Sequence, residues 1–597
     1  MTYGDDYMNK IEEFQILLFQ KKINCYIIPT SDFHQSEYVS DYFKGREYLS
    51  NFTGSAGTLV VTQNDARIWV DGRYFIQAEK QLPKNIHLMK MGAKGFPTID
   101  EYLKSVLNDE DTLAFDGRCL SASFVNNLTN TINKKINIID EIDLINEMWT
   151  DRPILPATPI FMLETFFSGE SYQSKIERIR EQMNFNKATN YLLTSLEDQA
   201  WLYNLRSNDV LYTPVFLAYT LITKNDTILY LDPKKLTPEI HNYLKENKVV
   251  VKPYFDIYEA IKNVSGKTIM DLSKVNYTLY HSFTNKDDII NIQNPTLLMK
   301  AIKNDTEIAN IKLAHIKDGV AVTKFMYYLK NNIGKQDLTE ISVSNYLQSL
   351  REEQKGFVEL SFNTICAYKE NAAMMHYSAS ELSNAKLEPN GFLLVDSGGH
   401  YLEGTTDITR TFALGELTDT MKLHFTTVLQ SVINLASAKF LKGIRGINLD
   451  ILARGPIWNL GIDYKCGTGH GVGYLLSVHE GPNGFRYQIV PERNDSAILE
   501  PGMITTDEPG IYLEGQYGIR TENELLCVKD ESTEFGDFLS FETITYAPID
   551  LDAIEPTILT KAQKDWLNNY HKQVFEKISP YLSPDEVEWL KKYTREI

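Results

Sequence analysis

The stretch KCGTGHGVGYLLSVHEGP, residues 465–482, combines a run of alternate glycines with two histidines, His470 and His479, nine residues apart. Side chains of an extended strand alternate between two faces, so the glycines at positions 467 to 473 would share one face and His470 would lie on the other. We expect the glycine face to let another group approach closely. Neither G-x-G-x-x-G nor the P-loop spacing fits these residues, which excludes the common nucleotide-binding loops.

Two acidic pairs flank turns on either side of that stretch in sequence. Residues 391–415 form two β-type runs around a glycine-rich turn, and a symmetric hairpin would place Asp396 opposite Asp407, with Cβ atoms about 5 Å apart. In TTDEPGIYLEGQYGIRTENELLCV, Glu508 and Glu522 are equally distant from Gly515. Like charges in such positions repel each other unless a cation lies between them.

Four carboxylates and one imidazole suit a pair of divalent metal ions about 3.5 to 4 Å apart. Each residue alone has a simpler interpretation, because an acid near a turn is usually solvated or caps the turn, and a single strand histidine is usually a packing residue. The joint occurrence of two acidic pairs and a glycine-flanked histidine strengthens the case for a metal site, and the spacing alone leaves both interpretations open.

Composition excludes several other classes of protein. The chain has 597 residues, 43% hydrophobic and 23% charged, as in a soluble globular protein. A net charge of -19 argues against nucleic-acid and acidic-membrane partners, and no apolar run approaches the about 20 residues of a membrane span. Five widely spaced cysteines without a C-x-x-C pair argue against a disulfide framework, so we expect a cytoplasmic protein.

The elements that must position these residues belong to the last of several domains. Residues 57–74, GTLVVTQNDARIWVDGRY, align with residues 218–235, AYTLITKNDTILYLDPKK, and three further segment pairs keep the same order. Strand-like runs that end in Asp alternate with helix-like runs, which predicts two related α/β domains. The Pro-rich stretch 149–159 suits a linker, and a second break falls near Pro295, before a long helical pattern.

Several long motifs in a fixed order resemble those of the pita-bread metallopeptidases, and specifically of the long, three-domain aminopeptidase P family. The motifs span almost the whole chain: SDFHQSEYVSDYF, WVDGRYFIQA, AWLYNLRSNDVLYTPVF, DSGGHYLEGTTDITRTFALG, GTGHGVG, VHEGP, TDEPGIY and GIRTEN. The resemblance implies two creatinase/prolidase-like α/β domains, residues 1–155 and 156–297, followed by a pita-bread catalytic domain with a C-terminal extension, residues 298–597.

The same resemblance implies a reaction and a set of residues. The family removes the first residue from peptides with proline in second position, by attack of a hydroxide that bridges two metal ions, most often Mn²⁺, with Zn²⁺ or Co²⁺ as alternatives. Position by position, it implies that the metal ligands are Asp396, Asp407, His470, Glu508 and Glu522. The implied catalytic residues are Glu508 as proton shuttle with His376 and His479, and the implied substrate contacts are Arg73, His376, His470, His479 and Arg520.

Rival interpretations remain open at this point. An Xaa-Pro dipeptidase, or prolidase, would have the same ligands but usually a single N-terminal domain, and a non-catalytic peptide-binding protein with this fold would have lost them. An interdomain or surface ion pair is an alternative role for Arg73. Cys466 stands where many relatives have His, so it is either a packing residue or a soft ligand. A homodimer is the family expectation.

Overall fold

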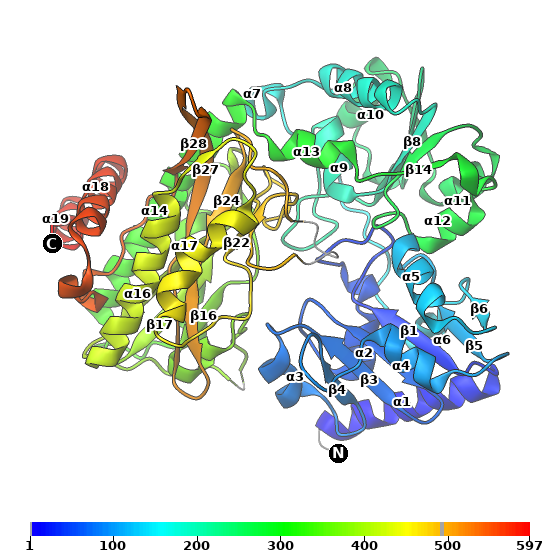
Figure 1. The fold of residues 1–597 in the computed structure, drawn as a ribbon, viewed down its shortest axis with the longest axis horizontal. Helices are drawn as coiled ribbons and strands as arrows, with labels where there is room; N and C mark the ends of the chain where they lie inside the picture. The colour runs from blue at the N-terminus through cyan, green and yellow to red at the C-terminus, as the bar shows by residue number, and fades with distance from the viewer. Residues whose placement is uncertain (1–2, 382, 490–494) are drawn as a thin grey trace. The chain divides into compact units, whose positions relative to one another are not determined.

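The computed structural model describes residues 3–381, 383–489 and 495–597. The chain divides into two compact units, one formed by residues 1–164 and 170–296 and the other by residues 165–169 and 297–597 (Figure 1). The helices of the first unit are α1 (Tyr3–Gln20), α2 (Gly45–Ser50), α3 (Phe75–Gln81), α4 (Ile99–Val106), α5 (Ala122–Ile132), α6 (Leu144–Met148), α8 (Tyr172–Phe185), α9 (Leu196–Tyr203), α10 (Pro238–Glu246), α11 (Ile257–Ala260) and α12 (Tyr277–Ser282).

Two six-stranded sheets of the same topology build the first unit. Their strand orders are β4-β3-β2-β1-β5-β6 and β12-β11-β10-β8-β13-β14. The strands of the first sheet are β1 (Cys25–Pro29), β2 (Thr58–Thr62), β3 (Ala66–Val70), β4 (His87–Lys90), β5 (Thr112–Phe115) and β6 (Asn137–Ile139). Those of the second are β8 (Asn190–Leu193), β10 (Ala218–Thr223), β11 (Thr227–Leu231), β12 (Val249–Lys252), β13 (Thr268–Met270) and β14 (Ile289–Asn291), and a short ribbon adds β7 (Phe161–Met162) and β9 (Leu205–Arg206).

The repeated sequence segments occupy equivalent places in these sheets, which confirms the predicted pair of related α/β domains. The aligned segments form the antiparallel hairpins β2–β3 and β10–β11. In the two hairpin turns, Thr62 and Thr223 each accept a hydrogen bond from the backbone N–H three residues later, at 3.0 and 2.9 Å.

At four places in the two sheets, an aspartate that directly follows a strand makes the same local hydrogen bond. In each case its side-chain Oδ1 accepts the backbone N–H of the second residue after it, at 3.0 to 3.1 Å. Such a bond closes a local turn and ends the strand. The four aspartates are Asp71, Asp116, Asp232 and Asp271.

The second unit carries the candidate chemistry. Its helices are α7 (Thr165–Ser168), α14 (Asp305–Asn332), α15 (Glu340–Glu352), α16 (Asp419–Ala436), α17 (Gly446–Trp458), α18 (Lys561–Ile578) and α19 (Pro584–Tyr593), and α13 (Pro295–Ala301) leads into it. Its strands are β15 (Phe357–Leu360), β16 (Ile365–Tyr368), β17 (Phe392–Ser397), β18 (Gly399–Tyr401), β19 (Gly404–Thr405), β20 (Ile408–Ala413), β21 (Lys439–Leu441), β22 (Gly469–His470), β23 (Gly484–Phe485), β24 (Ile504–Asp507), β25 (Gly510–Leu513), β26 (Tyr517–Arg520), β27 (Asn523–Thr533) and β28 (Gly536–Thr543).

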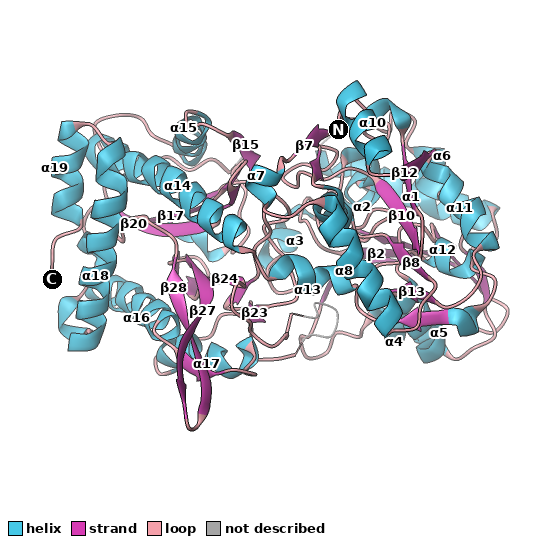
Figure 2. Ribbon diagram, turned by 90° about the horizontal axis from the view of Figure 1, so that it is seen from above, coloured by secondary structure: helices cyan, strands magenta, loops and turns pink. Residues whose placement is uncertain are grey.

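Helices cover β17 on both of its faces. Phe392 joins a core with α16, α18 and β26, while Leu393 and Val395 join another with α14, α15 and β20 (Figure 2). Because both faces are buried, the strand is a continuous apolar run that ends at Asp396. The fold therefore carries this carboxylate at the end of a fully buried strand.

The sequence predicts the register of the first acidic hairpin incorrectly, in contrast to that of the second. In the first hairpin Asp396 lies opposite Thr409, so the predicted direct pairing of Asp396 with Asp407 is wrong by two residues. The pairs His400–Thr405 and Tyr401–Gly404 continue the same register, so the hairpin centres between Leu402 and Glu403, one residue later than predicted. Asp407 thus becomes a diagonal neighbour of Asp396 on the same face.

The second hairpin has the predicted register. Gly510 pairs with Arg520 across β25 and β26, and the turn centres on Gly515, which has a φ of +71°. Continuing the same register beyond the ladder brings Glu508 and Glu522 opposite each other. A left-handed φ at the turn centre is the reason for a glycine there.

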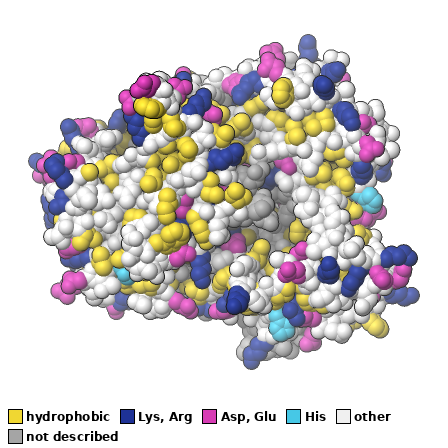
Figure 3. All heavy atoms as spheres, in the orientation of Figure 1, with side chains coloured by type: hydrophobic (Ala, Val, Ile, Leu, Met, Phe, Trp, Pro, Cys, Tyr) yellow, Lys and Arg dark blue, Asp and Glu magenta, His cyan; other side chains and the backbone are white. Residues whose placement is uncertain are grey.

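On the face drawn in Figure 3, acidic and basic side chains are interspersed with apolar ones. Within the described ranges, no helix is both long and apolar enough to cross a membrane.

Candidate metal centre

The glycine-rich stretch packs against the protein's own backbone and does not line an open site. Only Gly469 and His470 form a strand, β22, so the predicted extended run through residue 473 is wrong. A Cβ atom at Gly469 would lie 1.8 Å from the carbonyl oxygen of Thr506, and one at Gly471 would lie 2.1 Å from that of Glu480. The glycines let β22 pack directly on β24, which brings His470 beside Glu508.

His470 faces two of the predicted carboxylates. Its Nε2 lies 3.5 Å from Oδ2 of Asp407 and 3.3 Å from Oε1 of Glu508. Its Nδ1 lies 2.9 Å from the carbonyl oxygen of Gly471, to which it donates a hydrogen bond in the tautomer that leaves Nε2 as the ligand atom. The backbone thus fixes the orientation of the ring, as it does for many metal-binding histidines.

Asp407, His470 and Glu522 form a compact cluster of possible ligand atoms. One such atom from each residue lies within 4.8 Å of the others. Asp407 and Glu522 are 4% and 1% exposed, so water does little to screen the repulsion between their charges. Thr409 contacts Glu522 twice, since its Oγ1 donates to Oε2 at 2.7 Å and its carbonyl accepts the Glu522 N–H at 3.1 Å.

Asp396 and Glu508 lie at the edges of this cluster. Arg520 donates from Nη2 to Oδ2 of Asp396 at 2.5 Å, from Nε to Thr409 at 3.1 Å and from Nη1 to the Tyr512 hydroxyl at 2.6 Å. Glu508 accepts a hydrogen bond from Thr506 Oγ1 at 3.2 Å. The guanidinium therefore contacts Asp396 but leaves its second oxygen to the cluster.

The pKa values reflect crowded, buried acids. Burial, with the charge of Asp396 added and the His470 imidazole opposing, raises the pKa of Asp407 to about 7. Burial and the charges of Asp407, Glu508 and Asp396 raise the pKa of Glu522 well above its ordinary range. Burial acts against the charge of His470, but Asp407 and Glu508 hold its pKa well above the usual value. Burial would also raise the pKa of Glu508, yet His470 lowers it overall.

Unpartnered oxygens point to what the site holds. Oδ1 of Asp396 and Oε1 of Glu522 are buried and have no hydrogen-bond partner among the described residues. Buried carboxylate oxygens are normally paired or coordinate a metal ion. The donor set, four carboxylates and one imidazole with two oxygens unpaired, fits divalent cations.

The two predicted catalytic histidines outside the ligand set, His376 and His479, lie in different surroundings. The rings of His470 and His479 are in edge contact with centroids 4.3 Å apart, and the charge of His479 helps to lower the pKa of Glu508. His376 is half-buried in the turn after the 3₁₀ helix η6 (Lys369–Ala373). This helix packs closely on β26 at Gly518. A Cβ atom at that position would lie only 1.9 Å from the Ala372 carbonyl oxygen.

Arg73 belongs to the first unit. There it forms a two-pronged ion pair with Asp71, from Nε at 2.8 Å and from Nη2 at 2.8 Å. Its predicted contact with a peptide stays a prediction.

Cys466 resembles a packing residue more than a ligand. It is partly buried against the core that contains α16 and β26. Burial raises the pKa of its thiol to about 11, so the thiolate that binds metals is disfavoured.

Sequence reasoning missed the polar residues that hold the ligands. Thr409 and Thr506 hydrogen-bond Glu522 and Glu508, and Glu524 accepts the backbone N–H of Asp407 at 2.9 Å. The available signal was a polar residue inside an otherwise apolar, buried strand, as at Glu524 in NELLCV.

Comparison with known proteins identifies the family to which the chain belongs. Residues 309–529 match metallopeptidase family M24, residues 537–597 match the C-terminal region of peptidase M24, and residues 10–148 and 151–307 match creatinase/prolidase N-terminal domains. A probable Xaa-Pro aminopeptidase P of Aspergillus flavus is 37% identical over 98% of this chain and 92% of its own length. The chain belongs to the aminopeptidase P family of M24 metallopeptidases.

Solved structures agree with this family and with its fold. An X-prolyl aminopeptidase from Caenorhabditis elegans, described as a cytosolic enzyme with a di-nuclear active site, matches 100% of both chains with a TM-score of 0.94 at 31% identity. An Xaa-Pro dipeptidase from Bacillus anthracis matches only 64% of this chain, with a TM-score of 0.50 at 27% identity. The predicted fold, two creatinase-like domains before a pita-bread metallopeptidase domain, is confirmed.

The close approach at Gly469 gives a test of how the aminopeptidase P scaffold carries His470. Gly469→Ala should lower the free energy of unfolding by about 1 to 3 kcal/mol, because the added methyl group overlaps the Thr506 carbonyl. Gly455→Ala in α17 is the matched control, since a Cβ atom there meets nothing within 4 Å beyond its chain neighbours, so this substitution should lower the free energy of unfolding by less than Gly469→Ala. Denaturant unfolding measures both, and equal stability of the two variants would contradict this packing.

Proposed function

We propose that this chain is an Xaa-Pro aminopeptidase that removes the first residue of peptides with proline in second position. The observation that carries the proposal is the convergence of Asp407, His470 and Glu522 within 4.8 Å, in a chain that matches a di-nuclear X-prolyl aminopeptidase along its whole length. We propose Asp396, Asp407, His470, Glu508 and Glu522 as ligands of two divalent ions, with Mn²⁺ preferred over Zn²⁺ or Co²⁺. Oxygen-rich sites suit Mn²⁺.

Two such ions would polarise the scissile carbonyl and lower the pKa of a bound water molecule. The chain's own residues would then handle protons and orientation. Glu508 keeps a lowered pKa, so it is ionised and able to take a proton and pass it to the proline nitrogen that leaves. His479 lies against His470, which supports the role we propose for it as a hydrogen-bond donor to the peptide, and we propose the same role for His376.

Proline in the second position explains the need for a dedicated site. The bond before proline is a tertiary amide without an N–H, so a site that relies on that donor rejects it. Arg73 and Arg520 are the remaining proposed substrate contacts, and Arg520 already orients Asp396. We further propose a cytoplasmic homodimer, in keeping with the cytosolic C. elegans relative.

The activity itself is tested with metal-free protein. Addition of MnCl2 should start the release of arginine from Arg-Pro-Pro, measured by chromatography of the products, while Xaa-Pro dipeptides should be cleaved slowly or not at all. Cleavage confined to dipeptides would instead indicate a prolidase. A protein that binds Mn²⁺ and peptide but releases nothing would indicate a binding protein.

We propose that Asp407 would bridge the two metal ions, and Asp407→Asn tests this role. The substitution removes one negative charge between the two ions, so kcat/KM should fall by more than the roughly 10- to 100-fold typical of residues that only support ligands. The circular dichroism spectrum should stay unchanged. Asp550→Asn is the matched control, because it removes a buried carboxylate that pairs with Lys330, outside the cluster, and should keep its turnover. Unchanged turnover in Asp407→Asn would contradict the bridging role.

The raised carboxyl pKa values predict how pH affects metal binding. The pKa of Asp407 rises from an ordinary 3.8 to about 7, so the metal-free fold is favoured by protonation and loses this contribution as pH rises through 7. Metal ions replace those protons. The increase in Tm caused by MnCl2 should therefore be larger at pH 8 than at pH 6, and an equal increase at both pH values would refute the prediction.

A further inference from the structure

Two polar side chains of α14 lie fully buried one turn apart. His315 and Asp318 are both 0% exposed. Neither residue belongs to the proposed ligand set. Buried polar groups at such positions are costly unless they bond to something specific, so their contacts identify what they do.

His315 reaches the ligand set through Glu524. Its Nε2 lies 3.0 Å from Oε2 of Glu524, and both side chains are at most 1% exposed. The other carboxylate oxygen of Glu524, Oε1, accepts the backbone N–H of Asp407 at 2.9 Å. A continuous path of two contacts therefore joins α14 to the main chain of the proposed bridging ligand.

Asp318 forms a hydrogen bond with Thr406, the residue before Asp407. Its Oδ2 accepts a hydrogen bond from Thr406 Oγ1 at 2.6 Å, and its Oδ1 accepts from Arg351 Nε at 2.5 Å. Thr406 Oγ1 in turn accepts the backbone N–H of Gly399 at 2.9 Å, which ties the two strands of the hairpin together. The helix thus holds two consecutive residues, 406 and 407.

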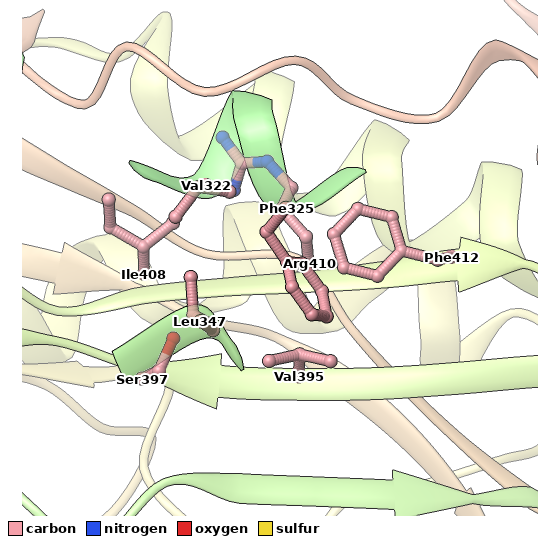
Figure 4. A pocket seen from close by; sticks show the side chains of 8 residues that line it. All are labelled: Val322, Phe325, Leu347, Val395, Ser397, Ile408, Arg410 and Phe412. Atoms are coloured by element: carbon pink, nitrogen blue, oxygen red, sulfur yellow. The ribbon is translucent and has the colours of Figure 1, made fainter. Parts of the chain in front are cut away.

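The helix itself is firmly seated. Further along α14, Val322 and Phe325 pack with Val395, Ile408 and Phe412 of the same hairpin (Figure 4). The apolar contacts fix the distance between helix and hairpin, so the polar contacts one to two turns earlier act from a fixed support.

We propose that His315 and Glu524 are positioning residues that hold Asp407 in place for the metal ions; the proposal rests on the proposed function. A carboxylate in the interior needs a partner at each of its oxygens, and for Glu524 these are the Asp407 N–H at Oε1 and the His315 ring, whose Nε2 lies 3.0 Å from Oε2. Loss of His315 leaves Glu524 with an unpaired charge, so it reorients and releases the Asp407 backbone. Partners behind metal ligands commonly matter in this way.

Mn²⁺ binding measures this role directly. His315→Leu should weaken the binding of Mn²⁺ to the metal-free full-length chain by about 10- to 100-fold, as followed by the electron paramagnetic resonance signal of free Mn²⁺. His315→Gln should keep most of the affinity, because its amide N–H₂ group can take the place of Nε2 beside Oε2 of Glu524. At saturating MnCl2, kcat should recover in His315→Leu while KM for Arg-Pro-Pro changes little.

The control is another buried histidine. His424→Leu removes a ring that contacts the Tyr517 hydroxyl at 2.9 Å and lies outside the path to Asp407. It should leave Mn²⁺ affinity unchanged even if it lowers Tm. In Glu524→Leu the further change His315→Leu should have no added effect on Mn²⁺ affinity, because His315 acts through Glu524.

The outcomes separate the two claims. Wild-type Mn²⁺ affinity in His315→Leu, with peptide release intact in the wild type, overturns the positioning role and leaves the proposed function standing. Equal losses in His315→Leu and His424→Leu also overturn it, because they indicate a general effect on the fold. A wild-type chain that binds no Mn²⁺ refutes the proposed function and this inference with it.

Discussion

The central constraint of this molecule is the repulsion between carboxylates that the fold forces together out of water. Asp407 and Glu522 are almost fully buried, and Asp396 and Glu508 add their charges. At an effective dielectric constant near 20, two unit charges 4 Å apart interact by about 4 kcal/mol, so several such pairs would oppose folding. The raised pKa values of Asp407 and Glu522 express this cost: without cations, the site keeps protons.

The rest of the catalytic unit holds these groups against that repulsion. Arg520 neutralises Asp396 from the second hairpin, while Thr409 of the first hairpin bonds Glu522 of the second. The hairpins are therefore cross-linked at the residues that repel each other. Glycines at close approaches let β22 join them without a gap, and α14 supports the first hairpin from behind.

Sequence reasoning recovered the chemistry better than the geometry. The residue types at positions 396, 407, 470, 508 and 522 predicted a metal site, and the register around Gly515 was predicted correctly because a short turn leaves few alternatives. The register around Asp396 was predicted wrongly because the hairpin turns at Leu402–Glu403, one residue later than the assumed centre, and a shift of one residue at the turn moves the pairing by two. Glu524 and His315 were missed because their importance lies in contacts between segments about 200 residues apart, which no local pattern encodes.

The four strand-ending aspartates bear on how the two N-terminal domains have diverged. Each copy has kept the aspartate and its bond to the N–H two residues later, so the backbone turn depends on that one side chain. The residue that supplies the N–H is free to vary, and it is Arg73 and Arg118 in one copy but Lys234 and Ser273 in the other. The backbone turn thus stays the same in both domains, while the side chain two residues after the aspartate can differ without a change in the fold.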